Sequence, residues 1–168
     1  MTAAANSVTV HATAVYLGGA VRQFGAVEGM AVLLIGGSGS GKSDVALRLI
    51  AEGGTLISDD QTLLSTDGER LFAESVDTIE GKMEIRGIGI ISVPHMAKAP
   101  IALVVQLAPG AATERLPEPS CYSPPPPLKA SRLPPIAVLD PLQPAITAKI
   151  TAAAATAATG RFVAGVAP

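Results

Sequence analysis

Short apolar runs separated by glycines dominate the first two thirds of the chain, and they predict a fold rich in strands. Residues Met30 to Ile35 are all apolar and have the length of a buried strand. Residues Asp44 to Ile50 instead place apolar side chains at helical spacing, and Gly53-Gly54 predicts that this helix ends near Glu52. The pattern therefore predicts a strand, a glycine-rich loop and a helix in direct succession.

Further strands are expected on both sides of this unit. Val8 to Leu17 alternates well enough for one strand, and Ala20 to Glu28 is expected to form a second strand or a hairpin arm. Thr55 to Ser58 predicts a buried strand. Gln61 to Phe72 predicts a hairpin around Asp67-Gly68, because Asp-Gly favours a tight hairpin turn.

The second half of the chain is less regular. We expect a loop leading into an isoleucine-rich strand over Ile79 to Val93, a strand from Ala99 to Leu107, and a short edge strand from Ile136 to Leu139. Eight prolines between residues 117 and 135 predict extended chain or loop there. Ala145 to Ala158 favours a helix that stops at Gly160, although its alanine- and threonine-rich end equally fits a low-complexity tail.

Together these elements predict a single α/β domain over residues 1–168. The helix after the glycine-rich loop is expected to pack on a twisted, mixed sheet. The best-supported core spans 8–118, followed by the proline-rich loop 117–135 and a C-terminal helix at 145–160. Residues 1–7 are expected to fray.

Composition narrows the classes of function. The net charge of −2 argues against general affinity for nucleic acid or anionic membranes, and the single cysteine, Cys121, excludes an internal disulfide or a cysteine-rich zinc site. Aromatic residues make up only 3% of the chain, so the core must depend on valine, isoleucine and leucine. No apolar run approaches the roughly 18 residues of a membrane span, which favours a soluble cytoplasmic protein.

The glycine-rich loop carries the clearest chemical signal. Residues 36–43 match the phosphate-loop pattern G-x-x-x-x-G-K-[ST] at every fixed position, between a predicted strand and a predicted helix. Its glycines allow the backbone amides to turn inward around an anion, Lys42 can reach the β- and γ-phosphates, and Ser43 can ligate Mg²⁺. A glycine-rich turn without a ligand is the simpler alternative. The residues expected to bind nucleotide phosphates are Gly36, Gly37, Ser38, Gly39, Ser40, Gly41, Lys42 and Ser43.

Five other residues are candidates on weaker grounds. Asp59 and Asp60 end a predicted strand, where phosphate-loop proteins commonly present a carboxylate to the metal or the reacting hydroxyl, although they also suit the start of a turn. Glu84 and Arg86 lie two residues apart and share a strand face, where pattern alone favours a salt bridge. Pattern alone likewise favours a hydrogen-bonded surface role for His11 over a catalytic one.

The phosphate loop, Leu56-Ile-Ser-Asp-Asp60 and Glu84-Ile-Arg-Gly-Ile-Gly-Ile-Ile91 together resemble the catalytic domain of the HPr kinase/phosphorylase family over about residues 8–118. That family phosphorylates a serine of HPr, the phosphocarrier of the bacterial sugar phosphotransferase system, and can reverse the reaction by phosphorolysis. The resemblance implies a P-loop kinase fold related to phosphoenolpyruvate carboxykinase, with Mg²⁺ and ATP, or pyrophosphate, as donor. It also implies an HPr-like partner and a homo-oligomer, a hexamer, in which the partner binds across subunits near the C-terminal helix.

The same resemblance implies catalytic roles. His11 matches the family's catalytic histidine, Lys42 its essential lysine, and Asp60 the carboxylate that accepts the serine proton. Arg115 resembles the catalytic arginine of a more distal segment.

The remaining roles concern the metal and the surrounding charge. Glu84 is similar to the family's second magnesium ligand, beside Ser43. Asp59 would support Asp60, and Arg86 would help offset charge on the transferring phosphoryl group.

Three departures from the family pattern shape these expectations. The N-terminal regulatory domain of longer members is missing, so we expect the short form known mainly from alphaproteobacteria. The longer spacing from His11 to Gly36 suggests an inserted hairpin around residues 20–28. Residues 134–141 stand near the family's distal Pro-x-x-Pro-Gly-Arg segment without its glycine or arginine, so kinase activity is better supported than phosphorylase activity.

Two other functions remain as alternatives. One is a phosphate-loop kinase that acts on a small molecule, and the other is a nucleotide-sensing regulatory protein without transfer activity. Asp60 and Arg115 argue against the second, because a pure binder needs neither.

Overall fold

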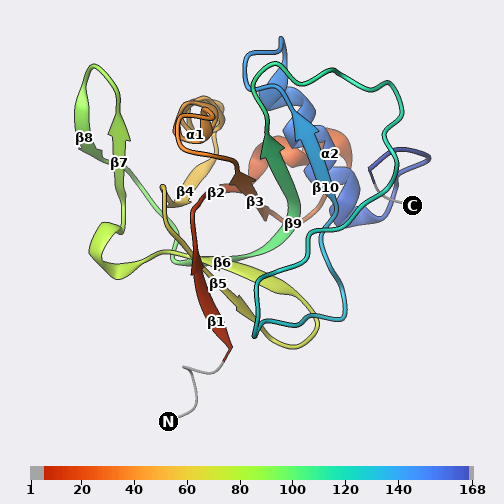
Figure 1. The fold of residues 1–168 in the computed structure, drawn as a ribbon, viewed down its shortest axis with the longest axis horizontal. Coiled ribbons are helices and arrows are strands. Elements are labelled where there is room, and N and C mark those ends of the chain that lie inside the picture. Colours follow the sequence, from red (N-terminus) through yellow and green to blue (C-terminus); the bar gives the residue numbers. More distant parts are fainter. Residues whose placement is uncertain (1–5, 167–168) are drawn as a thin grey trace.

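The computed structural model describes residues 6–166. These residues form one curled eight-stranded sheet, a separate two-stranded hairpin and two α-helices (Figure 1). Most of the segment predicted to fray, residues 1–5, lies outside the described residues, and Ser7 already begins the first strand.

The large sheet is mixed, as predicted. Its strands run in the order β1-β5-β6-β9-β3-β2-β4, and β10 pairs with β9. Strand β9 pairs in parallel with β3 and β10, whereas the other pairs are antiparallel. The strand bounds are β1 Ser7–Val10, β2 Ala12–Leu17, β3 Met30–Ile35, β4 Thr55–Ser58, β5 Thr62–Thr66, β6 Leu71–Glu74, β9 Lys98–Leu107 and β10 Ile136–Leu139.

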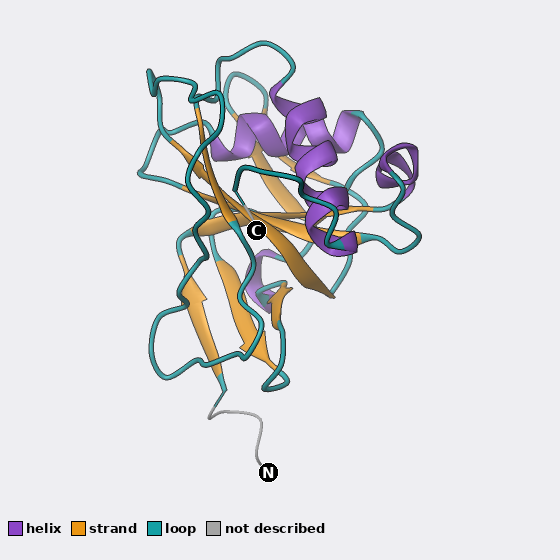
Figure 2. Ribbon diagram, turned by 90° about the vertical axis from the view of Figure 1, so that its right-hand side faces the viewer, coloured by secondary structure: helices purple, strands orange, loops and turns teal. Residues whose placement is uncertain are grey.

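The long strand β9 joins the two parts of this sheet. Its first residues pair with β6, and the residues from Ile101 onward pair with β3 and β10. In Figure 1 the strands β1, β5 and β6 accordingly lie below the rest of the sheet, and Figure 2 shows the two α-helices against its upper part.

Both helices begin and end close to the predicted residues. Helix α1 covers Lys42–Ala51, and helix α2 covers Ile146–Thr159 with Gly160 in the left-handed conformation at its end. The apolar residues Ile146, Ile150 and Ala154 are spaced four apart and are all buried, so they form one face of α2. The alternative of a low-complexity tail is therefore excluded for residues 146–159.

The central strand β3, between antiparallel β2 and parallel β9, is buried on both faces. Val32 and Leu34 belong to the core beneath the helices, whereas Ala31 and Leu33 belong to a second core on the opposite face. Leu128 of the proline-rich loop is only 4% exposed and packs into that second core. The proline-rich loop thus covers the face that the helices leave open.

Two predictions of secondary structure near the N-terminus were wrong. The expected strand 8–17 is broken at His11, and its halves pair with different partners: β1 with β5, and β2 with β3 and β4. The expected strand or hairpin arm 20–28 is instead the short 3₁₀-helix η1, Gly19–Phe24. Because β2 already has a neighbour on each side, this segment cannot pair with the strand that it follows, and it buries Val21 instead.

The segment 79–93 is also more regular than predicted. It follows a 3₁₀-turn, η2 Asp77–Ile79, and forms a hairpin of β7 Lys82–Ile85 and β8 Gly89–Ser92. Gly87 has a φ of 83°, which allows the tight turn between the two strands. Figure 1 places this hairpin at the side of the molecule, beyond α1.

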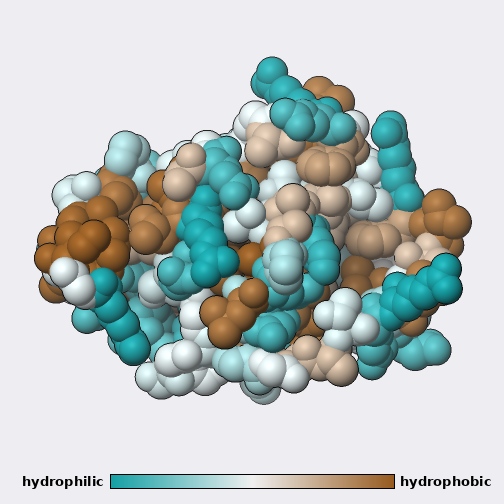
Figure 3. Space-filling model, turned by 90° about the horizontal axis from the view of Figure 1, so that it is seen from above, coloured by the Kyte–Doolittle hydropathy of each residue, from teal (hydrophilic) through white to brown (hydrophobic). Residues whose placement is uncertain are grey.

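Hydrophobic side chains gather on the surface of this hairpin, at the left of Figure 3. Ile88 and Ile90 are 75% and 74% exposed. No helix within residues 6–166 is long and apolar enough to cross a membrane.

The burial pattern predicts where a truncation is costly. Leu34→Ala should lower the free energy of unfolding by about 2–5 kcal/mol, because it leaves a cavity in the core beneath the helices. Ile88→Ala, at an exposed position, should change it by less than about 0.5 kcal/mol. Urea denaturation of both variants tests this, and equal effects would contradict the assignment of the core.

Candidate functional site

The phosphate loop connects the end of β3 to the start of α1, as predicted. Gly36, Gly39 and Gly41 have φ values of 151°, 75° and 93°, which non-glycine residues rarely adopt. A Cβ on Gly36 would lie 2.5 Å from Ser40 Oγ and 2.9 Å from the Leu107 carbonyl oxygen. The loop therefore requires glycine at position 36 for steric as well as conformational reasons.

The backbone of the phosphate loop holds the side chain of Lys42 across the loop. Its Nζ donates to the carbonyl oxygens of Gly36 and Gly37, both at 2.9 Å, and lies 3.1 Å from His11 Nε2. Burial lowers the pKa of Lys42, and the nearby carboxylates of Asp60 and Asp59 oppose that shift. Since an ammonium has three protons to donate, every donor of Lys42 has an acceptor.

This contact fixes the tautomer of His11. An ammonium can only donate, so His11 Nε2 accepts and the ring proton is on Nδ1. Nδ1 faces two acceptors of Asp60, the carbonyl oxygen at 3.1 Å and Oδ1 at 3.2 Å. His11, at the break between β1 and β2, thus links Lys42 to Asp60.

The adjacent carboxylates lie in different surroundings. Asp59 is only 6% exposed, and its Oδ1 accepts hydrogen bonds from Ser43 Oγ at 2.7 Å and Thr13 Oγ1 at 3.0 Å. Asp60 has a φ of 64°, and its side chain is 67% exposed. Asp59 therefore faces the start of α1, whereas Asp60 faces the solvent beside His11.

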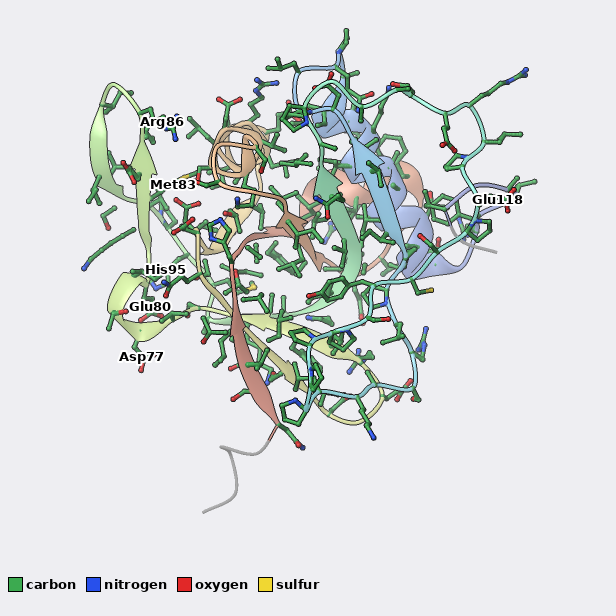
Figure 4. The ribbon with its side chains drawn as sticks, viewed as in Figure 1. Asp77, Glu80, Met83, Arg86, His95 and Glu118 are labelled. Atoms are coloured by element: carbon green, nitrogen blue, oxygen red, sulfur yellow. The ribbon has the colours of Figure 1, made fainter. Side chains whose placement is uncertain are left out.

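A cavity of about 860 Å³ lies in front of these groups. The hairpin β7–β8 forms its other wall, and Figure 4 shows Met83 in β7, the hairpin strand nearest α1, and Arg86 just after the end of that strand. No ion pair joins Glu84 to Arg86 within residues 6–166. The lining residues with polar or charged side chains are His11, Ser38, Lys42, Ser43, Asp44, Asp59, Asp60, Gln61, Thr78, Lys82, Glu84 and Arg86.

The base of the hairpin is fixed to the sheet. His95 Nε2 lies 3.1 Å from Glu80 Oε1, and the two side chains meet at the foot of the hairpin in Figure 4. The backbone N–H of Met96 donates to the carbonyl oxygen of Leu56 in β4, at 2.8 Å. The backbone N–H of Glu84 faces Asp59 Oδ2 at 3.4 Å. The wall that carries Glu84 is thus connected to the strand that ends at Asp59.

Arg115 is not part of this arrangement. It is exposed in the loop after β9 and does not line the cavity. Glu118, three residues further on, lies on the opposite side of the molecule from the hairpin in Figure 4. The structure brings His11, Lys42, Ser43, Asp59, Asp60, Glu84 and Arg86 to one cavity and leaves Arg115 outside it, so the role of Arg115 stays a prediction.

Several polar residues at the site were not predicted from the sequence, among them Thr13 and Lys82. Thr13 is fully buried and contacts both aspartates, and Lys82 lines the hairpin wall. The available signal for Thr13 was a hydroxyl between two alanines in a predicted strand.

The residues present fit a nucleotide with a bound magnesium ion. Ser40 Oγ is buried without a hydrogen-bond partner among the described residues, in a loop whose shape suits an anion. Ser43, Asp59 and Glu84 supply oxygen donors. Residues 6–166 hold no cluster of three His, Cys, Asp or Glu side chains placed to bind a metal alone, and Mg²⁺ in nucleotide sites is commonly held by one or two carboxylates together with phosphate oxygens.

A buried strand leads into a glycine-rich loop that ends in a lysine, and a helix follows. Two aspartates lie at the end of another strand of the same sheet. This arrangement defines a phosphate-loop domain. Comparison with models of protein families identifies the family of this domain. The model of the HPr Serine kinase C-terminal domain matches residues 14–115. The chain therefore belongs to this family.

Curated relatives agree with that assignment. The HPr kinase/phosphorylase of Mycoplasmopsis pulmonis is 38% identical over 89 residues, which are 53% of this chain and 26% of that protein. That of Bacillus cytotoxicus is 47% identical over 68 residues, which are 40% of this chain and 22% of that protein. The aligned segments thus span about a quarter of the relatives' own length.

A solved structure confirms the fold. The Hpr(Ser) kinase/phosphatase from Coxiella burnetii superposes with a TM-score of 0.63 over 91% of this chain and 89% of that chain, at 21% sequence identity. The curled mixed α/β sheet and the phosphate loop on it are therefore the family's fold.

The loop geometry predicts a contrast between neighbouring glycines. Gly36→Ala should weaken Mg-ATP binding at least about tenfold, because a left-handed φ and a backbone contact both oppose the added methyl group. Gly37→Ala should bind Mg-ATP nearly as the unchanged protein does, because a Cβ there meets no atom within 4 Å. Calorimetric titration of both variants tests this, and normal binding by Gly36→Ala would show that the loop is not the phosphate site.

Proposed function

We propose that this protein is a Mg²⁺-dependent kinase that transfers the γ-phosphate of ATP to a serine of an HPr-like phosphocarrier protein. The observation that carries the proposal is the linked set Lys42, His11 and Asp60, which presents an exposed carboxylate beside a phosphate loop. Family membership and the relatives' names support HPr as the class of acceptor.

The phosphate loop and Lys42 bind the donor. Backbone amides of the loop and the start of α1 face the phosphates, and Lys42 exchanges its contact with His11 for a phosphate oxygen while Gly36 and Gly37 keep it in place. Mg²⁺, when bound, offsets the charge that develops between the β- and γ-phosphates. Ser43 and Glu84 are the donors expected from the resemblance, and Asp59 joins them because its Oδ1 lies 2.7 Å from Ser43 Oγ.

Asp60 acts on the acceptor. Its carboxylate orients the serine hydroxyl and accepts its proton as the hydroxyl oxygen attacks the γ-phosphorus. His11 keeps Asp60 in position through Nδ1–H, and Arg86 on the hairpin wall offsets negative charge on the transferring group. Asp59 and Asp60 therefore divide the work between metal and acceptor.

The partner protein binds where the cavity opens to solvent. The proposed assembly is a homo-oligomer, a hexamer by resemblance. Because Arg115 does not line the cavity of its own chain, its proposed catalytic role requires a neighbouring subunit or a movement of its loop. The proposal is limited to the kinase direction, because residues 134–141 contain neither glycine nor arginine.

Transfer of labelled γ-phosphate from Mg-ATP to purified HPr tests the proposal. The unchanged protein should label a serine of HPr. Lys42→Ala should lose both nucleotide binding and transfer, whereas Asp60→Asn should bind ATP normally and transfer about 10²- to 10⁴-fold more slowly, because only the proton acceptor is lost. Lys129→Ala, at an exposed position of the proline-rich loop outside the cavity and away from α2, is the matched control and should be fully active.

Two outcomes would redirect the assignment. Label on a small molecule but not on HPr would favour a small-molecule kinase. Tight ATP binding without any transfer would favour a nucleotide-sensing protein and would remove the proposed role of Asp60.

A further inference from the structure

The hydroxyl of Thr13 contacts both aspartates of the site. Thr13 lies in β2 and is fully buried. Its Oγ1 is 3.0 Å from Asp59 Oδ1 and 3.1 Å from the backbone nitrogen of Asp60. The hydroxyl oxygen of Thr13 therefore hydrogen-bonds to two consecutive residues that follow another strand, β4.

The chemistry of the three groups fixes the direction of both hydrogen bonds. The ionised carboxylate of Asp59 can only accept, and the backbone N–H of Asp60 can only donate. The Thr13 hydroxyl therefore donates its single proton to Asp59 and accepts from Asp60 through a lone pair. Removing this hydroxyl would leave the buried Asp59 carboxylate and the partly buried Asp60 N–H each short of one partner.

Both bonds act at a point where the backbone is unusual. Asp60 has a φ of 64°, a conformation that costs energy in a residue other than glycine. This conformation turns Asp60 toward His11 while Asp59 stays turned toward Ser43. Thr13 therefore bonds to the backbone of Asp60 and to the side chain of Asp59.

We propose that Thr13 is a positioning residue that holds the metal-facing carboxylate of Asp59 and the acceptor-facing Asp60 in their separate orientations. The Asp60 half of this proposal rests on the proposed kinase function. The Asp59 half concerns metal affinity alone and can be measured without any transfer.

Two variants of Thr13 separate the hydroxyl from the rest of the side chain, and a third variant is their control. Thr13→Val keeps the shape and removes the hydroxyl, and Thr13→Ser keeps the hydroxyl and removes the methyl group. Thr151→Val is the matched control, because Thr151 is also a buried threonine but its hydroxyl donates to Thr147 within α2, away from the cavity.

The first readout is steady-state transfer to HPr. Thr13→Val should lower kcat about ten- to hundredfold, the loss typical of a hydrogen bond to a charged group, while KM for ATP changes less than about twofold, since the phosphate loop is untouched. Thr13→Ser should restore kcat to within about threefold of the unchanged protein. Thr151→Val should leave both constants unchanged.

The second readout is independent of catalysis. Mn²⁺ affinity in the presence of ADP, followed by electron paramagnetic resonance, should fall about tenfold in Thr13→Val, as is typical when a group that orients a metal ligand is lost. It should stay near normal in Thr13→Ser and Thr151→Val. If Thr13→Val does not fold, Thr13→Cys, whose thiol is a weak donor, should show intermediate losses.

Several results would overturn the proposal. Normal kcat and Mn²⁺ affinity in Thr13→Val, or in Thr13→Cys where that variant replaces it, would show that the hydroxyl positions neither aspartate. Equal losses in Thr13→Val and Thr13→Ser would show that the methyl group matters instead. If the unchanged protein transfers no phosphate to HPr, the proposed function fails, and the Mn²⁺ affinities still decide whether Thr13 orients Asp59.

Discussion

The placement of the Lys42 ammonium is the constraint on which the site depends. A buried ammonium is costly unless its protons find acceptors, and here two carbonyl oxygens of the loop and the ring of His11 provide them. The carbonyls of Gly36 and Gly37 point at Lys42 because the loop adopts backbone angles that suit glycine. The lysine is therefore directed across the loop by groups that need not move, and only its contact with His11 faces the cavity.

The sheet brings the remaining groups to this point. Strand β2 lies between β3, which leads into the phosphate loop, and β4, which ends at the aspartates. At the break before β2, His11 lines the cavity. Two residues later, the hydroxyl of Thr13 hydrogen-bonds to both aspartates. The hairpin β7–β8 is bound to β4 through Met96 and supplies the opposite wall. Three of these segments converge because their strands are neighbours in the sheet, and the separate hairpin joins them through its hydrogen bond to β4.

Sequence patterns predicted those elements that depend only on residues close together in the chain. The phosphate loop, both α-helices, β3, β4 and the β5–β6 hairpin were predicted from spacing, glycines and apolar runs, and the family resemblance named most residues of the cavity. The break at His11 and the 3₁₀-helix after β2 were not predicted, because both depend on which strand edges are already paired. The separate surroundings of Asp59 and Asp60 depend on the φ of Asp60 and on Thr13, which lies 46 residues from Asp59 in the chain. Arg115 was assigned from the resemblance, and its position relative to the cavity depends on a long loop that has no local signal.

A crystal structure with Mg²⁺ and a non-hydrolysable ATP analogue tests the division of roles most directly. We predict the β- and γ-phosphates within the loop of residues 36–43, with Lys42 still bonded to Gly36 and Gly37 and now also to a phosphate oxygen. The metal should lie at Ser43, Asp59 and Glu84, and the carboxylate of Asp60 should face the γ-phosphate from the solvent side. Phosphates bound outside the loop, or a metal held by Asp60 instead of Asp59, would contradict this account of the site.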